Sequence, residues 1–310
     1  MKMHPDQLHV DEEIVRHLIA EQFPRWHAES VRHVAGAGTV NAIFRIGEDV
    51  AARFPLTPGD PEELAESLGK EAAAMDELAA VCPIPTPVHV AHGRPGQGYP
   101  MPWSVQTWLP GRVGTPDGLA HSADFAGNLI TVIRALREAD TGGGQFAGAG
   151  RGGDLPDSDE WMETCFREST RLLPVDELRA LWERFRVLPG SGPDRMTHGD
   201  LIPGNLLVDG ERLTGVLDGG GFSPADPALD LVAAWHLLDR DMRGVLREGL
   251  DIGSIEWSRG AAWAFQQSMG LVWYYRDSNP EMSMLGRSTL SRILSDPEIS
   301  SGDRRPTHSS

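Results

Sequence analysis

The fold of this chain is predicted from one stretch, Thr197-His198-Gly199-Asp200-Leu201-Ile202-Pro203-Gly204-Asn205-Leu206-Leu207-Val208. Its last three residues form an apolar run that predicts a short strand. The next dipeptide, Asp209-Gly210, is a strong turn signal, and residues 213–217 predict the returning strand. We therefore expect a hairpin that begins after Asn205 and ends at Asp218.

This hairpin is expected to gather three oxygen-bearing side chains. A hairpin returns its two ends to one place, so Asn205 and Asp218 should meet beside Asp200. Hard cations such as Mg²⁺ take oxygen ligands, usually one or two carboxylates with water and substrate phosphate. Kinases use this arrangement, in which a loop Asp accepts the hydrogen bond of the substrate hydroxyl while an Asn and a second Asp hold the metal. Asp200 is therefore predicted to be catalytic, and Asn205 and Asp218 are predicted to bind Mg²⁺.

The same residues resemble the phosphotransfer core of the aminoglycoside phosphotransferase family, relatives of protein kinases that phosphorylate small molecules. That family has His-Gly-Asp, then four residues, an Asn, a hairpin and an Ile or Leu before an Asp. His198-Gly199-Asp200, Asn205 and Leu217-Asp218 match this pattern in order and spacing. The resemblance implies a nucleoside triphosphate as phosphoryl donor and a hydroxylated small molecule as acceptor. It also implies that His198, counted with Asp200 among the catalytic residues, packs the catalytic loop.

Three other interpretations are open. A His-x-Asp alone is commonly a loop with a capped turn, and the Asp-Gly dipeptide explains itself as a turn. A metal-dependent hydrolase could use His198, Asp200 and Asp218 as ligands. A catalytically silent nucleotide-binding module is the third, and the presence of Asp200, Asn205 and Asp218 argues against it.

The composition is that of an ordinary globular protein. The chain has 310 residues, of which 40% are hydrophobic and 24% charged, enough for two lobes with a large core. Its formal net charge of −17 disfavours nucleic acid and anionic membranes as partners. No apolar run approaches the roughly 20 residues of a membrane span. The N-terminus lacks an apolar segment, and Cys82 and Cys165 form no metal or disulfide pattern. We therefore expect a soluble, cytoplasmic protein.

A small-residue turn near the N-terminus is expected to face phosphates. Residues 31–47 predict a strand, a turn that contains Gly36, Gly38 and Thr39, and a second strand. Glycine has no side chain to keep a phosphate away from backbone N–H groups, although Gly-x-Gly between strands is usually only a hairpin. In the resembled family the nucleotide-covering loop lies here, often with an Asn that matches Asn41. These four residues are expected to bind the nucleotide.

An ion pair is predicted between Arg53 and Glu71. Residues 50–55 predict a strand on which kinases place a Lys for the α/β-phosphates. Arg53 occupies that position, and Arg binds phosphate bidentately. On the following helix, which Asp60 can cap, Glu71 falls inside the apolar stripe at about 100° per residue. A carboxylate that faces the core needs a partner, and Arg53 is the nearest candidate unless Glu71 reaches solvent at the helix edge.

The connection between the lobes is predicted at residues 106–111. Residues 103–109 predict a strand that Pro110-Gly111 ends. In kinase-like folds the chain crosses between lobes here and its backbone hydrogen-bonds the adenine. Gln106 and Trp108 are therefore expected to contact the nucleotide, and the sequence does not decide between ATP and GTP.

The C-terminal half is predicted to be mainly helical. The glycine-rich residues 141–153 predict a mobile connector, with a part of the acceptor pocket as the alternative. Asp226 is expected to cap a helix, and Asp230 lies among apolar residues, too apolar a place for an idle charge. This resembles the family's Asp-Pro-x-x-Asp-Leu motif, in which the second Asp supports the catalytic loop through backbone N–H groups. Helices are predicted over residues 11–23, 121–140, 159–172, 175–187, 239–248 and 257–276.

These observations predict an α+β, bilobal, protein-kinase-like fold. A small, β-rich, nucleotide-binding lobe is expected over residues 1–109, a larger, mainly helical lobe with the catalytic and acceptor sites over 110–299, and a disordered tail over 300–310. The expected reaction moves the γ-phosphoryl group of ATP or GTP to a hydroxyl of a small molecule. The resemblance implies an aminoglycoside or related antibiotic. A macrolide or a metabolic hydroxyl, on an amino alcohol, sugar or nucleoside, is the alternative acceptor.

Overall fold

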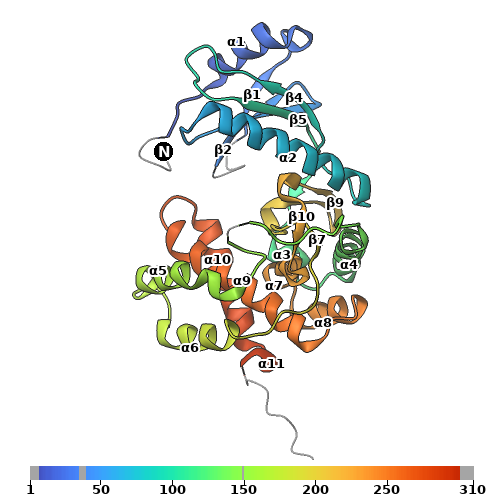
Figure 1. The fold of residues 1–310 in the computed structure, drawn as a ribbon, viewed down its shortest axis with the longest axis vertical. Helices are drawn as coiled ribbons and strands as arrows, with labels where there is room; N and C mark the ends of the chain where they lie inside the picture. Colours follow the sequence, from blue (N-terminus) through green and yellow to red (C-terminus); the bar gives the residue numbers. More distant parts are fainter. Residues whose placement is uncertain (1–6, 35–39, 149, 301–310) are drawn as a thin grey trace, which may run out of the picture. The chain divides into compact units, whose positions relative to one another are not determined.

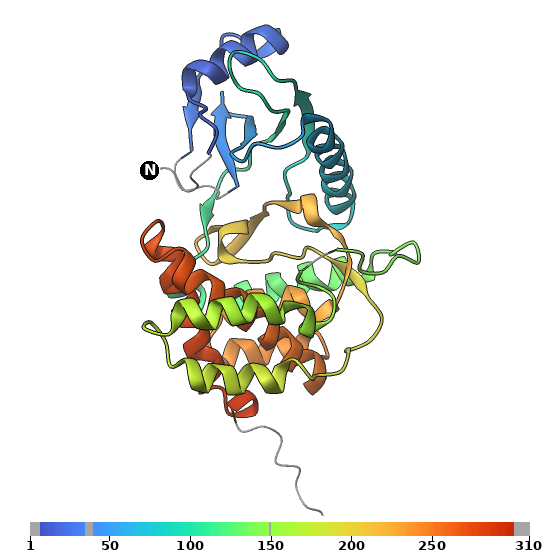
Figure 2. The ribbon, with the colours of Figure 1, turned by 60° about the vertical axis from the view of Figure 1, so that its left-hand side comes forward.

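The structure, a computed structural model, describes residues 7–34, 40–148 and 150–300. The chain divides into two compact units: Met1–Arg112 with Thr214–Phe222, and Val113–Leu213 with Ser223–Ser310. Figures 1 and 2 show the elements of each unit. The grouping of Thr214–Phe222 with the first unit was not part of the expected lobe boundaries. The predicted disordered tail lies, apart from Ser300, outside the described residues.

The first unit is built on a five-stranded antiparallel sheet of order β1-β2-β3-β5-β4. The two strands predicted within residues 31–47 and those predicted at 50–55 and 103–109 are confirmed, as is the helix predicted over 11–23. The elements of this unit are α1 (Glu12–Gln22), η1 (Pro24–Trp26), β1 (Val31–His33), β2 (Asn41–Ile46), β3 (Val50–Pro55), α2 (Pro61–Val81), β4 (His89–Gly93), β5 (Trp103–Thr107) and η4 (Gly219–Gly221).

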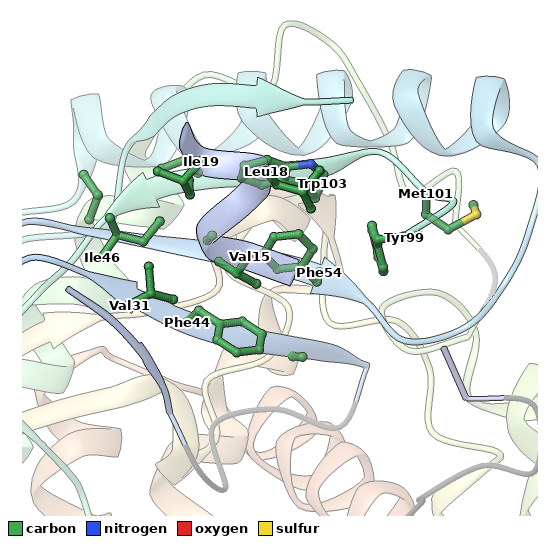
Figure 3. Packing of buried hydrophobic residues seen from close by; sticks show 14 of the residues in the cluster. Val15, Leu18, Ile19, Val31, Phe44, Ile46, Phe54, Tyr99, Met101 and Trp103 are labelled. Carbon is green, nitrogen blue, oxygen red and sulfur yellow. The ribbon is translucent and has the colours of Figure 1, made fainter. Parts of the chain in front are cut away.

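One face of this sheet packs against α1 and forms an apolar core (Figure 3). Leu18 of α1 is fully buried there, together with Phe54 and Trp103, whose rings stack with centroids 4.7 Å apart. Gly93 is required beside this stack, because a Cβ at that position would lie 1.9 Å from the Trp103 ring. Side chains alternate between the two faces of a strand. With Phe54 in this core, its neighbour Arg53 points to the opposite face of the sheet.

Helix α2 begins where the sequence predicts. The side chain of Asp60 accepts hydrogen bonds from the backbone N–H groups of Glu62 and Glu63. A residue with a side-chain oxygen at this position satisfies N–H groups that have no partner inside the helix. The buried side of α2 includes Leu78, which contacts the short helix η4.

The second unit is mainly helical, and its longest helix, α9, is buried along most of its length. Helix α9 packs against α10, η5 and α5, and Figures 1 and 2 show α5 and α6 side by side. The elements that begin in this unit or at its boundary are β6 (Arg112–Val113), α3 (Pro116–Leu119), α4 (Ala123–Glu138), η2 (Leu155–Ser158), α5 (Asp159–Ser169), α6 (Val175–Phe185), β7 (Arg195–Thr197), η3 (Pro203–Asn205), β8 (Leu206–Asp209), β9 (Arg212–Val216), β10 (Ser223–Ala225), η5 (Pro227–Leu231), α7 (Val232–Leu237), α8 (Arg240–Gly249), α9 (Ser254–Tyr274), α10 (Pro280–Ser295) and α11 (Pro297–Ser300).

The predicted hairpin is confirmed as β8 and β9, which are adjacent in a sheet of order β6-β8-β9. Gly210 in the turn has φ of 62°, in the left-handed region that favours glycine. A second small sheet, in which β7 pairs with β10, was not predicted. The predicted fold class is confirmed: a mixed α+β protein with a five-stranded sheet in its N-terminal part and a larger helical C-terminal part. In the described part of the chain, no helix is long and apolar enough to cross a membrane.

Candidate active site

The loop between β7 and η3 is fixed at its base by a buried carboxylate. Asp230 of η5 is 1% exposed and accepts hydrogen bonds from the backbone N–H groups of His198 and Gly199, both at 3.0 Å. Gly199 has φ of 80°, which favours glycine. Burial raises the pKa of Asp230, while the nearby His198 ring and the two N–H groups lower it. The predicted support of the loop by Asp230 is therefore confirmed.

A second carboxylate holds η5 itself. Asp226 accepts from the backbone N–H of Ala228 at 3.1 Å, which confirms the predicted cap, although the capped helix starts as a 3₁₀ turn. Its Oδ2 atom accepts from Nε of Arg259 at 2.8 Å and from Nε1 of Trp263 at 2.7 Å. Both donors are on α9, and all three side chains are buried. The segment that carries Asp230 is thus tied to the longest helix of the unit.

Asp200 lies in this loop, and its carboxylate has three donors in the described part of the chain. Nδ2 of Asn205 lies 3.1 Å from Oδ2, while Nη2 of Arg151 at 2.7 Å and Nε2 of Gln267 at 3.0 Å donate to Oδ1. The Asp200 side chain is 33% exposed. An ionised carboxylate only accepts hydrogen bonds, so this exposed group can receive one more donor from a bound molecule.

Asn205 is oriented so that its amide oxygen can serve as a metal ligand. Its Nδ2 atom donates to the backbone oxygen of Asp200 at 2.9 Å and to the Oδ2 of the same residue. The amide nitrogen therefore faces Asp200, and Oδ1 points away from it. Among the described residues no donor is recorded for this oxygen. A carbonyl oxygen of this kind is a ligand that Mg²⁺ accepts, so the residue fits the predicted role.

His198 is buried beneath the loop. The residue is 1% exposed, and its Nδ1 atom accepts from the backbone N–H of Asp200 at 3.3 Å. An imidazole nitrogen that already accepts a hydrogen bond is not open to a metal ion. This position suits a residue that packs the catalytic loop, and it argues against His198 as the Nδ1 ligand of a hydrolytic metal centre.

In the first unit, Arg53 pairs with a different carboxylate from the one expected. Its Nη2 atom donates to Oδ1 of Asp218 at 2.8 Å, and its Nη1 atom lies 3.5 Å from Oε1 of Gln106. Within the described residues this is the one ion pair of Arg53, so the predicted direct pair with Glu71 is wrong. Glu71 nevertheless interacts electrostatically with both the Arg53 guanidinium and the Asp218 carboxylate. Burial raises its pKa, the Arg53 guanidinium lowers it and Asp218 raises it again.

The glycines after Asp218 are explained by close packing. A Cβ on Gly219 would lie 2.4 Å from Cδ2 of Leu78, and one on Gly220 would lie 3.1 Å from Cβ of Glu71. Asp218 itself has φ of 60°, which is uncommon for a residue with a side chain and is often found at functional sites. These glycines form the turn η4 directly against α2.

The predicted nucleotide contacts at the connection between lobes require revision. Gln106 is inside β5, paired on one side with Ala51 and on the other with His89. The backbone N–H of Trp108 donates to the backbone oxygen of Asp49 at 2.7 Å. A base contact through this N–H is therefore blocked. Gln106 instead presents its side chain beside Arg53, on the sheet face opposite the α1 core.

The predicted phosphate-facing turn falls largely outside the described residues. Gly36, Gly38 and Thr39 belong to that part of the chain. Asn41 is the first residue of β2 and is paired with Pro55 of β3. The convergence of Asp200 and Asn205, in the second unit, with Asp218, in the first, stays a prediction.

Three residues around Asp200 were given no role by the sequence. Arg151 and Gln267 donate to its carboxylate, and His236 contacts Gln267. His236 lies in an apolar helix between Trp235 and Leu237, the same kind of signal that identified Asp230. Gln267 similarly interrupts the buried part of α9 and marks it as a candidate. Arg151 carries no such signal, because it is a single cation in a glycine-rich run, and only the fold brings it to Asp200.

Comparison with known proteins identifies the family of this chain. The sequence matches the phosphotransferase enzyme family over residues 32–263. No match was found among curated proteins. Three similar solved structures, each at most 20% identical, support the fold alone. They are the GDP and kanamycin complex of APH(2")-IIia (TM-score 0.68, 18% identity, 89% of this chain and 97% of that chain), macrolide 2'-phosphotransferase MphH from Brachybacterium faecium (0.57, 20%, 89% and 98%) and the streptomycin-ATP-APH(2")-IIa ternary complex (0.58, 18%, 92% and 97%). Since the family match spans more than half of its length, the chain belongs to the phosphotransferase enzyme family.

Proposed function

We propose that this protein moves the γ-phosphoryl group of ATP or GTP to a hydroxyl of a small molecule, an aminoglycoside or a related antibiotic. Membership of the phosphotransferase enzyme family supports the reaction class. Similar structures that contain GDP with kanamycin, or ATP with streptomycin, support the donor and the acceptor class.

The observation that carries this proposal is the environment of Asp200. Its carboxylate is partly exposed and held by donors from Asn205, Arg151 and Gln267. In phosphoryl transfer, a carboxylate in this position accepts the hydrogen bond of the attacking hydroxyl and receives its proton. The hydroxyl oxygen forms the new bond to phosphorus, and the bond to the nucleoside diphosphate breaks.

The nucleotide is assigned to residues of both units. Arg53 would bind the α/β-phosphates, and the Glu71 carboxyl would interact electrostatically with the Arg53 guanidinium. Asn205 and Asp218 would hold Mg²⁺, whose charge offsets that of the phosphate oxygens. Asn41, Gln106 and Trp108 are kept as side-chain contacts to the nucleotide, with Gly36, Gly38 and Thr39 as the phosphate-facing turn.

The acceptor is the finer part of the proposal. The formal net charge of −17 favours the approach of a cationic acceptor. A macrolide is the second candidate, because a macrolide 2'-phosphotransferase is among the similar structures. We place the reaction in the cytoplasm, where nucleoside triphosphates are available, with neither nucleic acid nor a membrane as partner.

Nucleotide consumption with Mg²⁺ across aminoglycosides, macrolides and amino alcohols tests the proposal. We expect acceptor-dependent formation of nucleoside diphosphate and a phosphorylated acceptor detectable by mass spectrometry. Asp200→Asn should lower kcat by at least about 100-fold, since it removes the proton acceptor, and should retain nucleotide binding. Phosphate release that needs no acceptor and prefers Zn²⁺ or Mn²⁺ would instead indicate a hydrolase.

A further inference from the structure

The hydrogen bonds of Asp200 leave one of its two oxygens open. Oδ1 accepts from Arg151 at 2.7 Å and from Gln267 at 3.0 Å, whereas the only side chain of the described residues that donates to Oδ2 is Asn205, at 3.1 Å. Each carboxylate oxygen has about two lone-pair positions. Oδ1 is therefore saturated, and Oδ2 keeps one position for a further donor.

Gln267 is itself oriented by a buried histidine. Its Oε1 atom lies 3.0 Å from Nε2 of His236, and Nδ1 of His236 lies 2.8 Å from Oγ1 of Thr289. Since ionised Asp200 can only accept, Gln267 must turn its NH₂ group to Asp200 and its oxygen to His236. His236 then carries its proton on Nε2, and its Nδ1 atom faces the Thr289 hydroxyl, which donates to the backbone oxygen of Leu285 at 2.9 Å.

The neutral state of His236 keeps these hydrogen bonds pointing in one direction. The ring is 0% exposed, and burial lowers its pKa to about 4, although the hydrogen bond to Gln267 raises it. Of the charged groups around it, Asp200 favours the protonated ring, while Arg151 and Arg292 disfavour it. Buried hydrogen bonds rigidify the groups that they join, so the donors lead from His236 through Gln267 to Asp200 in a fixed order.

The two donors to Oδ1 come from different kinds of element. Gln267 is on α9, between the buried residues Gln266 and Ser268, whereas Arg151 belongs to the glycine-rich segment. A side chain on a packed helix keeps its position better than one on a loop. We propose that Gln267 is a positioning residue that holds Asp200 so that the open position on Oδ2 accepts the hydroxyl of the acceptor. This inference rests on the proposed function.

A pair of neighbouring glutamines tests the proposal. Gln267→Met keeps the size of the side chain but removes both hydrogen bonds. Gln266→Met is the matched control, since Gln266 is 8% exposed on the same helix and makes no hydrogen bond to Asp200 within the described residues. We expect Gln267→Met to lower kcat by about 10–100-fold, the scale of a misplaced catalytic group, with the nucleotide KM changed by less than about twofold. Gln266→Met should keep the wild-type kcat.

A second variant gives a readout that a purely structural role would not change. Gln267→Glu retains the acceptor for His236 but places a carboxylate against Oδ1 of Asp200. Like charges at this distance raise the pKa of the introduced carboxyl. We expect kcat to be low at pH 8 and to rise relative to the wild type as the pH falls towards 6, because the protonated carboxyl again donates to Asp200.

The outcomes distinguish a failure of the positioning role from a failure of the proposed function. A folded Gln267→Met protein with kcat within twofold of the wild type overturns the positioning role and leaves the proposed function intact. If Gln267→Met does not fold, a Gln267→Glu pH profile parallel to that of the wild type overturns it instead. Failure of the wild-type protein to phosphorylate any acceptor contradicts the proposed function itself, and the positioning role with it.

Discussion

At the scale of single residues, the site depends on polar groups that are buried but fully paired. Asp230 is the clearest case, since its two oxygens each accept one backbone N–H from the loop that presents Asp200. Leaving a buried N–H unpaired costs about 1–3 kcal/mol. The Asp230 carboxylate therefore fixes the backbone of the loop, and in this way it positions Asp200.

His236 predicts a specific dependence of stability on pH. Its pKa is lowered from 6.5 to about 4 in the folded state, chiefly by burial. As the pH falls below 6.5, the unfolded chain binds a proton that the folded chain does not, so stability present above pH 6.5 is lost towards pH 4. A shift of this size corresponds to about 3 kcal/mol. Urea unfolding from pH 7.5 to 4 should show this loss in the wild type.

The matched comparison uses two histidines. In His236→Gln the excess loss of stability at low pH should disappear, whereas His17→Gln, at an exposed position of α1, should leave the wild-type pH dependence unchanged. If the two variants have the same profile, His236 is not neutral in the folded protein, and the direction that we assign to the hydrogen bonds towards Asp200 is wrong.

At the scale of secondary-structure elements, local patterns were reliable and partners were not. The Asp60 cap of α2 and the helix α4 follow from patterns that act over a few residues, and both were predicted. The partner of Arg53 was not, because Asp218 is 165 residues away in sequence and reaches Arg53 only through the packing of η4 against α2. Periodicity identifies which face of an element is buried, but it carries no information about what covers it.

The glycine-rich segment shows the same limit. Its composition predicts a mobile connector, whereas the structure anchors its described residues by several long-range hydrogen bonds. The backbone N–H of Phe146 donates to Asp194 at 2.7 Å, and the backbone oxygen of Gly152 accepts from Asp226 at 2.8 Å. The prediction of a mobile connector is therefore wrong. The glycines of this segment allow close approach, because a Cβ on Gly153 would lie 2.7 Å from the Phe146 ring.

The contact of α2 with η4 can be tested with two alanine substitutions. Gly219→Ala would place a Cβ 2.4 Å from Leu78, which is fully buried, so we expect a loss of about 1–3 kcal/mol of stability from overpacking. Gly69→Ala, in the middle of α2, meets no atom within 4 Å and should add up to about 1 kcal/mol. Chemical denaturation measures both. A Gly219→Ala protein as stable as the wild type would mean that η4 does not pack closely against α2.

At the scale of the whole molecule, the proposed work is divided between the two units. Arg53, Glu71 and Asp218 belong to the first unit, and Asp200 and Asn205 belong to the second. The sequence predicts all five as site residues from their type and spacing, because each motif is short. It could not establish their arrangement, which depends on contacts between residues far apart in the chain. Substitutions of Arg53 and of Asp200 should therefore separate nucleotide binding from transfer.

Thermal unfolding with and without nucleotide makes this separation measurable. A ligand at about 100 times its Kd stabilises the state that binds it by about 2.7 kcal/mol, which for a protein of this size raises Tm by roughly 4 °C. We expect this shift in the wild type with nucleotide and Mg²⁺, and also in Asp200→Asn. Arg53→Met should lose most of it, because the phosphates lose their guanidinium partner.

Two further variants show why the nucleotide-induced shift in Tm is lost in Arg53→Met. Arg53→Lys keeps a cation on the same strand but lacks the planar guanidinium, so it should recover part of the shift. Arg32→Met removes an exposed cation from β1, in the same sheet, and should retain the full shift. If Arg53→Met and Arg32→Met respond to nucleotide equally, general charge explains the effect and Arg53 does not bind the phosphates. If Asp200→Asn loses the shift together with Arg53→Met, the carboxylate takes part in nucleotide binding, and its assignment to the acceptor hydroxyl alone is wrong.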